Sequence, residues 1–460
     1  MPGWSGELPS KMYSGFVSAG PSPGMPGSSM WVHYVFIECE SSPSTAPLLV
    51  WYNGGPGASS MFGLLVELGP FLLNDLSLED PRFNQTGIPQ LIPNPYSWSK
   101  LGNLLIVDNP PPVGFSFCLP AGPTADGNSC GPWNDQYVAQ TNLIFLKNWF
   151  QEYPAFMNND LYLLGESYAG VYVPSIVREI LKSPGGLKLK GFGVGDGCIG
   201  TDVLCGSSHG PYYSIEFMHG HGQFSNQLYR TIRSNCPESE LKKGNLTAEC
   251  VKLVGQVWDE VGGFYDYNLY DDCIDRNIFF HRQQVVRTFW DKSYPLSLQA
   301  ALNDYPCPGS AFDIWINRTD VREAINVPVD SYFFSGDNGA GFNYTETEKN
   351  LLPFYKEVLT NTNLKVLVYN GDTDPGINSF VTQDIYFDYF ASVGLPQRKS
   401  WRPWTLDGKK RMGGYVTQYD QFDYVTIRGS GHMVPEYKPA AAFTLLQSWL
   451  RDREYPPFSS

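Results

Sequence analysis

Residues 161–170 read LYLLGESYAG, the most informative stretch of the sequence. Its first four residues are apolar and predict a strand buried on both faces of a sheet. A Gly-x-Ser-x-Gly pattern follows directly and leads into a helix-compatible stretch. In that setting Ser167 lies on a sharp strand-to-helix turn, where Gly165 and Gly170 avoid clashes that larger side chains would cause. We therefore predict Ser167 as a nucleophile and the backbone N–H of Tyr168, at a helix N-terminus, as a donor to an oxyanion.

The pattern alone is common, and a chance match in a glycine-rich turn is the alternative interpretation. The rest of the chain favours the nucleophile, because short apolar runs bounded by Gly, Asn or Asp recur and predict further buried strands. These runs cover residues 48–51, 104–107, 366–369 and 425–427. Residues 30–38 are rich in aromatic and β-branched types and predict one strand of an antiparallel pair.

Two helical patterns lie between or after these runs. Residues 134–152 begin with an Asn-Asp cap, carry regularly spaced apolar side chains and end before Tyr153-Pro154. Residues 439–451 begin with proline and place apolar residues on one face. Strands that alternate with helices predict an α/β protein with a mostly parallel central sheet flanked by helices.

The middle of the chain, roughly residues 198–315, breaks this alternation. It is rich in cysteine, mixed in polarity and without clean apolar strand runs. We therefore expect a core formed by residues 1–195 and 316–460, and a cap or lid insertion at residues 196–315.

A parallel sheet with a Gly-x-Ser-x-Gly turn is typical of the α/β-hydrolase fold, in which the nucleophile, the acid and the histidine follow in that order. His432 fits the last place, since it follows an apolar run and a Gly-Ser-Gly turn. His33 lies within a predicted strand and is interpreted as structural. The other four histidines fall in the insertion: His209, His219, His221 and His281. His219 and His221 could ligate a metal, but no third ligand lies near them in the sequence, so no metal site is predicted.

The acid should follow an intervening strand, and the loop after residues 366–369 holds Asp372 and Asp374. We favour Asp374, which lies farther along the loop, as the partner that orients His432. Asp372 is expected to stabilise the turn, a common role of aspartate in loops.

A further segment, WYNGGPGASS at residues 51–60, completes a set of four motifs. Together with residues 165–170, 371–374 and 431–435 it resembles the serine carboxypeptidase family, including its cathepsin A-like and vitellogenic-like branches. The resemblance covers most of the chain. Other matching stretches are residues 94–98, 113–116, 316–321 and 401–416.

The resemblance implies roles for residues outside the triad. Gly55 would supply a second N–H to the oxyanion hole. Asn53, Glu67 and Glu166 would bind the free α-carboxylate of the substrate, with Trp51 supporting them. Two carboxyl groups held close together share a proton, because both cannot ionise cheaply. We therefore expect peptide binding to weaken as the pH rises through the upper pKa of the glutamate pair.

The activity that the resemblance implies is hydrolysis of the C-terminal peptide bond of peptides or proteins through an acyl-enzyme, at acidic pH. It needs neither a metal nor an organic cofactor. The alternatives are an acyltransferase or lyase on the same scaffold and a non-catalytic binding protein. An intact site for a substrate carboxylate favours the peptidase.

Composition limits the partners. The chain has 460 residues and a net charge of −14, which argues against nucleic acid because phosphate binding needs a surplus of Lys and Arg. With 42% hydrophobic residues it can form a sizeable core. No run approaches 18 consecutive apolar residues, so no membrane span is expected. The sequence leaves homodimerisation open.

Cysteines and glycosylation sequons favour the secretory pathway, with a lysosome, a vacuole or the extracellular space as the destination. Residues 1–20 lack a signal-peptide pattern, so we expect the targeting segment to be missing from this sequence. The sequons begin at Asn84, Asn245, Asn317 and Asn343.

The nine cysteines leave at least one thiol unpaired. Disulfides are plausible between cysteines close in sequence, at 118/130, 198/205 and 236/250, although spacing does not fix the pairing. Position 58 is Ala where the family usually has a disulfide-bonded Cys, so Cys307 lacks its usual partner. A bond to Cys273 and a free thiol both stay open.

Overall fold

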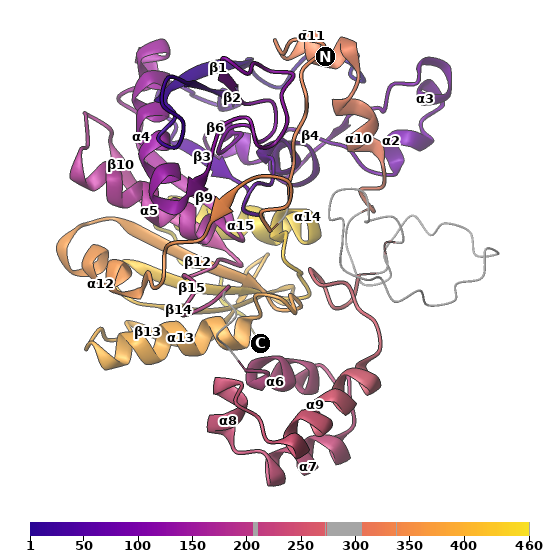
Figure 1. Ribbon diagram of the computed structural model, residues 1–460, viewed down its shortest axis with the longest axis vertical. Helices are drawn as coiled ribbons and strands as arrows, with labels where there is room; N and C mark the ends of the chain where they lie inside the picture. Colours follow the sequence, from indigo (N-terminus) through magenta and orange to yellow (C-terminus); the bar gives the residue numbers. More distant parts are fainter. Residues whose placement is uncertain (206–209, 272, 274–305, 337, 460) are drawn as a thin grey trace.

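The computed structural model describes residues 1–205, 210–271, 273, 306–336 and 338–459. Among them, eleven strands form one sheet, in the order β1-β2-β6-β3-β9-β10-β12-β15-β14-β13, with β7 paired to β2 (Figure 1). The strands are β1 Met12–Pro21, β2 Ser29–Ile37, β3 Leu48–Tyr52, β6 Asn103–Val107, β7 Phe117–Leu119, β9 Leu161–Glu166, β10 Leu189–Gly195, β12 Lys365–Gly371, β13 Lys399–Thr405, β14 Met412–Gln418 and β15 Phe422–Ile427.

The centre of the sheet is parallel and its edges are antiparallel. The strands from β6 to β15 pair in parallel, and β3 and β9 are buried along their whole length. Strand β2 pairs with β1 antiparallel, and β14 pairs antiparallel with both of its neighbours. The predicted α/β class, the central strands and the antiparallel first pair are thus confirmed.

Strand β10 had no strong strand pattern because it contains three glycines in seven residues. The structure explains two of them through close contact with β12. A Cβ on Gly191 would lie 2.4 Å from the backbone oxygen of Lys365, and one on Gly195 would lie 2.3 Å from the ring of Tyr369. Glycine lets β10 lie between its neighbours, and it hides the strand from a pattern based on apolar side chains.

Helices cover both faces of the sheet, and each face has its own hydrophobic core. One face packs against α4 Asp135–Glu152, α5 Ala169–Lys182, α12 Leu352–Asn361 and α13 Ser379–Ser392. The other packs against the π-helix Gly63–Leu68, α10 Ala311–Ile316, α11 Thr319–Ala324, α14 Val434–Tyr437 and α15 Pro439–Leu450. Helices α4 and α15 agree with the two predicted helices, and the side chain of Asn134 caps α4 as expected.

The shorter elements lie mainly in the connections. They are α1 Ser60–Phe62, α2 Leu76–Glu79, α3 Pro81–Thr86, the 3₁₀ turns Trp98–Lys100 and Pro154–Phe156, and the strands β4 Phe71–Leu72, β5 Ile92–Pro93, β8 Trp133–Asn134 and β11 Tyr344–Thr345. Within the described part of the chain, none of the helices combines the length and the apolar character that crossing a membrane requires.

Four helices of the predicted insertion gather at one end of the molecule (Figure 1). They are α6 Tyr212–Gly220, α7 Asn226–Asn235, α8 Glu238–Lys243 and α9 Ala248–Val261, and they share a small hydrophobic core of their own. Helix α6 contacts α13 of the sheet layer. His209 and His281 lie outside the described residues, and the predicted domain boundaries stay a prediction.

Four disulfides join Cys118 to Cys130, Cys198 to Cys205, Cys236 to Cys250 and Cys273 to Cys307. The first three are the pairs close in sequence, and the fourth resolves the open position of Cys307. Cys39 is an unpaired, buried thiol. All four sequon asparagines are exposed.

Candidate active site

Ser167 lies in the turn between β9 and α5, in the backbone conformation that the motif predicts. Its φ is +62°, in the left-handed region that non-glycine residues rarely occupy. Its N–H donates to the carbonyl of Gly195 at 2.9 Å. A Cβ on Gly165 would lie 2.5 Å from the backbone oxygen of Tyr52, and one on Gly170 would lie 2.4 Å from that of Cys198. The two glycines of the motif therefore allow the turn to pack against neighbouring backbone.

His432 lies after β15, and its ring faces the loop after β12. Its Nδ1 is 2.7 Å from Oδ2 of Asp374, and both side chains are buried. The other carboxylate oxygen of Asp374 accepts the N–H groups of Gly376 (2.8 Å) and Ile377 (3.3 Å). The buried Nε2 of His432 makes no hydrogen bond with a described residue. That nitrogen is available to a substrate or a nucleophile.

Asp372, the alternative acid, points elsewhere. Its carboxylate accepts the N–H of Gly429 at 2.6 Å and so joins the two loops that carry Asp374 and His432. The loop of His432 is also held by the insertion, because the His432 N–H donates to the carbonyl of Tyr267 at 2.7 Å. The Tyr267 ring meets the imidazole edge to face, with centroids 5.1 Å apart.

A cavity opens between these loops, and both Ser167 and His432 line it. Its other walls come from the segment after β3, from the end of β9, from the insertion and from two later loops. They are Asn53, Gly54, Gly55, Ala58, Ser59, Phe62, Glu166, Tyr267, Ser335, Gly336 and Met433. The fold thus brings residues from five distant stretches of the chain to one cavity.

The glycine-rich loop after β3 lies directly against the serine turn. A Cβ on Gly54 would be 2.3 Å from the backbone nitrogen of Tyr168, so the two segments approach more closely than side chains allow. Gly55 has a φ of +107° and lines the cavity beside Ser167. The loop and the turn therefore bring the backbone of Gly55 and of Tyr168 close to the predicted nucleophile.

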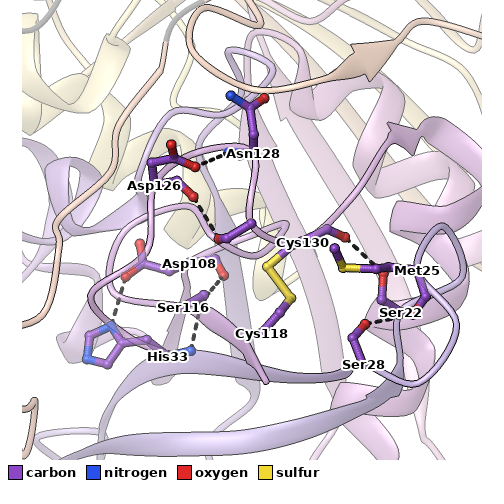
Figure 2. Close-up of a disulfide and its surroundings, with 11 residues drawn as sticks. Ser22, Met25, Ser28, His33, Asp108, Ser116, Cys118, Asp126, Asn128 and Cys130 are labelled. Carbon is purple, nitrogen blue, oxygen red and sulfur yellow. Dashed lines mark hydrogen bonds and ion pairs between the residues drawn. A yellow bond between two sulfur atoms is a disulfide. The ribbon is translucent and has the colours of Figure 1, made fainter. Parts of the chain in front are cut away.

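A buried polar network supports the far end of this loop. Ser59 donates its hydroxyl to Oδ1 of Asp108 at 2.5 Å, and Oδ2 of Asp108 faces Nδ1 of His33 at 2.8 Å. Figure 2 shows His33 and Asp108 beside Ser116, whose hydroxyl accepts the His33 N–H and donates to the Asp108 carbonyl. The structural role expected of His33 is thus explained, whereas sequence reasoning gave Asp108 no role.

Asn53 connects the cavity to two buried glutamates. Its Nδ2 donates to Oε1 of Glu166 (2.8 Å) and to Oε1 of Glu67 (3.1 Å). Its Oδ1 accepts the indole N–H of Trp51 (2.8 Å) and the N–H of Gly63 (3.2 Å), which fixes the orientation of the amide. The second oxygens of both glutamates are buried and unpaired among the described residues. These four predicted residues therefore form one hydrogen-bonded group next to Ser167.

Burial dominates the electrostatics of this group. Burial is the main cause that raises the pKa of Glu67 to about 7, against the hydrogen bond from Asn53, which lowers it, and with a smaller rise from the nearby Glu436. Burial also raises the pKa of Glu166 well above its ordinary value, with the Glu67 charge as the next cause. Because two carboxylates this close repel each other, the pair retains a proton into the neutral pH range.

Asp196 is a site residue that sequence reasoning missed. Its carboxylate oxygen, that of Asp374 and a ring nitrogen of His432 lie within 4.8 Å of one another. Such a group could hold a cation, but the facing atoms of Asp374 and His432 already bond to each other, so we assign no metal. Its only sequence signal was an aspartate between two glycines at the end of a strand.

His219 and His221 have partners other than a metal. A ring nitrogen of His219 lies 2.9 Å from Oδ1 of Asn226, and its ring stacks on Tyr229. A ring nitrogen of His221 lies 2.8 Å from the carbonyl oxygen of Phe217.

Comparisons with known proteins found related chains and a related solved structure. A family model described as serine carboxypeptidase matches residues 2–452. The lysosomal protective protein of Mus musculus is 29% identical over 99% of this chain and 93% of its own length. Serine carboxypeptidase-like 34 of Arabidopsis thaliana is 31% identical, over 97% of this chain and 87% of its own. The crystal structure of Kex1(delta)p, a prohormone-processing carboxypeptidase from Saccharomyces cerevisiae, is similar with a TM-score of 0.66 at 18% identity. The match covers 98% of this chain and 95% of the other, and it shows that the two share a fold.

Proposed function

The chain belongs to the serine carboxypeptidase family and is a serine-type hydrolase of peptide bonds, and we propose that Ser167, His432 and Asp374 perform its chemistry. In this proposal Ser167 attacks the carbonyl carbon of the last peptide bond. His432 takes the serine proton at Nε2 and then gives it to the leaving amine. Asp374 orients the ring through Nδ1 and stabilises the imidazolium. Water then attacks the acyl-enzyme, and His432 acts again as the base.

The negative charge that develops on the carbonyl oxygen needs donors that are already in place. We assign this role to the backbone N–H groups of Gly55 and Tyr168. Donors fixed by the fold stabilise the transition state without a cost of reorganisation, and the loss of one such donor typically lowers kcat by about 10²–10³-fold.

The preference for a C-terminus rests on the Asn53 group, and this observation carries the proposal. A neutral Glu166 carboxyl at the cavity wall donates a hydrogen bond to the substrate α-carboxylate, while Glu67 and Trp51 hold Asn53 in place. A peptide that lacks a free C-terminal carboxylate does not use this donor. An acyltransferase or lyase gains nothing from such a group unless its substrate also ends in a carboxylate.

The test compares a free-acid peptide with the same peptide amidated at its C-terminus. Mass spectrometry should show stepwise loss of C-terminal residues from the free acid and little from the amide. Ser167→Ala and Asp374→Asn should abolish cleavage, and the matched variant Asp372→Asn should retain it. Equal cleavage of both peptides, or an active Ser167→Ala enzyme, would refute the assignment, and transfer of the acyl group to an alcohol would point to an acyltransferase.

The disulfides and the relatives are consistent with the secretory pathway. Within that pathway we propose a lysosomal, vacuolar or extracellular location, since the proton shared by the buried glutamates favours an acidic compartment. Glycosylation at Asn84, Asn245, Asn317 and Asn343 is part of the same proposal and is supported by their exposure. Homodimerisation stays a prediction that sedimentation analysis can test.

A further inference from the structure

Asp196 is held in an unusual conformation directly behind the proposed triad. It follows β10, between β9 and β12, and its side chain is fully buried. Its φ is +42°, which is strained for a residue with a Cβ. Its N–H donates to the carbonyl of Tyr369 at 2.7 Å. Strain of this kind persists only where the surrounding structure imposes it, and it is enriched at functional sites.

The carboxyl group of Asp196 is bound on one side by neutral donors. The N–H of Gly371 lies 3.0 Å and 3.1 Å from its two oxygens, and Nδ2 of Asn370 lies 3.1 Å from Oδ1. On the other side lies the carboxyl group of Asp374, with one oxygen of each aspartate and a ring nitrogen of His432 within 4.8 Å of one another. Two buried carboxyl groups this close cannot both ionise cheaply, so one of them tends to hold a proton.

The surroundings decide which of the two aspartates holds that proton. Asp374 faces the His432 ring and accepts two backbone N–H groups, an arrangement that suits a carboxylate anion. Burial raises the pKa of Asp196 well above its ordinary value, and the charge of Asp374 raises it further. Among the described residues, the charge of Asp196 also raises the pKa of three further acidic groups. They are Glu166, Tyr369 and Tyr424.

We propose that Asp196 is a positioning residue of the triad: as a neutral acid it donates a hydrogen bond to Asp374 and favours the neutral form of His432. A hydrogen bond to Asp374 withdraws negative charge from the oxygens that face the imidazole. The imidazolium is then less stabilised, relative to the neutral ring, than it would be beside a carboxylate without this donor. This device suits a serine hydrolase that works in acid, because a protonated histidine cannot accept the serine proton. The inference rests on the proposed function of Ser167, His432 and Asp374.

The test measures the pH profile of kcat for Asp196→Asn and Asp196→Gly. Asparagine tolerates a positive φ and keeps an N–H donor at all pH values, so its profile should follow that of the wild type. Glycine adopts the same backbone without strain but removes the donor, and the acid limb should move up by roughly half to one pH unit. Asp423→Asn replaces a half-buried acid at the opposite end of β15 and should leave the profile unchanged.

Thermal unfolding checks that each variant is folded, and Asp196→Ser replaces the glycine variant if that one is not. The proposal is overturned if the acid limb stays in place without the donor, or if Asp196→Asn moves it as far as Asp196→Gly does. Either result would leave a purely structural role for Asp196. The proposed function fails separately, through an active Ser167→Ala enzyme.

Discussion

Replacing Glu166 by glutamine should remove most of the pH dependence of peptide binding. In the wild type, the pKa values of Glu67 and Glu166 are raised by burial, so the pair holds a proton in acid and loses it as the pH rises. Glutamine can keep the acceptor for Asn53 at one side-chain atom and place a permanent N–H donor at the other. The donor to the substrate carboxylate then survives at every pH.

The size of the effect follows from the bond that is lost. A hydrogen bond to a charged group contributes about 1.5–3 kcal/mol, which corresponds to roughly 10- to 150-fold in affinity. Repulsion between an ionised glutamate and the substrate carboxylate, about 4 kcal/mol at 4 Å in a medium of effective dielectric constant 20, acts in the same direction. A loss of about tenfold from acidic to mildly basic pH is therefore the lower limit for the wild-type pair.

Calorimetric titration of a free-acid peptide into Ser167→Ala enzyme measures binding without turnover. As the pH is raised from about 5 through the upper pKa of the pair, the dissociation constant should rise at least tenfold, because the shared proton, and with it the donor, is lost there. The double variant Ser167→Ala/Glu166→Gln should change by less than about threefold. The amidated peptide should bind weakly and without pH dependence in both. If the double variant loses affinity as steeply as the single one, the shared proton is not the donor.

Other perturbations test the fold around the site. The pKa of Glu67 is near its ordinary value of 4.5 in the unfolded chain and about 7 in the folded protein. Its contribution to the free energy of unfolding, on the order of 3 kcal/mol, is therefore present in acid and lost as the pH rises between these values. A melting temperature that increases over this pH range in differential scanning calorimetry would contradict this. Gly170→Ala should lower the free energy of unfolding in urea by about 1–3 kcal/mol or more, because its Cβ would clash with the backbone of Cys198. The control Gly255→Ala lies in open space on α9 and should be neutral or stabilising. Asp108→Ala should lower the free energy of unfolding by about 3–5 kcal/mol and lower kcat, since it leaves the buried donors of His33 and Ser59 unpaired. The control Asp126→Ala, at an exposed position, should change neither quantity. Equal unfolding midpoints for the two variants would show that the network does not support the loop.

Elements with local signals could be predicted from the amino-acid sequence. The buried strands, helix α4 with its cap and the serine turn all depend on the order of side chains along a few residues. Chain order then ranked His432 above the other histidines, since an imidazole after an apolar run and a glycine turn fits the carboxyl edge of a parallel sheet. Strand β10 was not predicted, because its three glycines remove the apolar pattern by which the other buried strands were recognised.

Which polar groups meet, and which of them keep a proton, depends on how distant segments pack together. Asp372 and Asp374 stand two residues apart on one loop, and packing directs one toward Gly429 and the other toward His432. Asp196 lies 178 positions before Asp374 in the sequence, yet the parallel pairing of β10 with β12 brings the two carboxyl groups together. Desolvation and charge repulsion act between segments far apart in the chain, so the shifted pKa values of Glu67, Glu166 and Asp196 arise only when the sheet assembles around them.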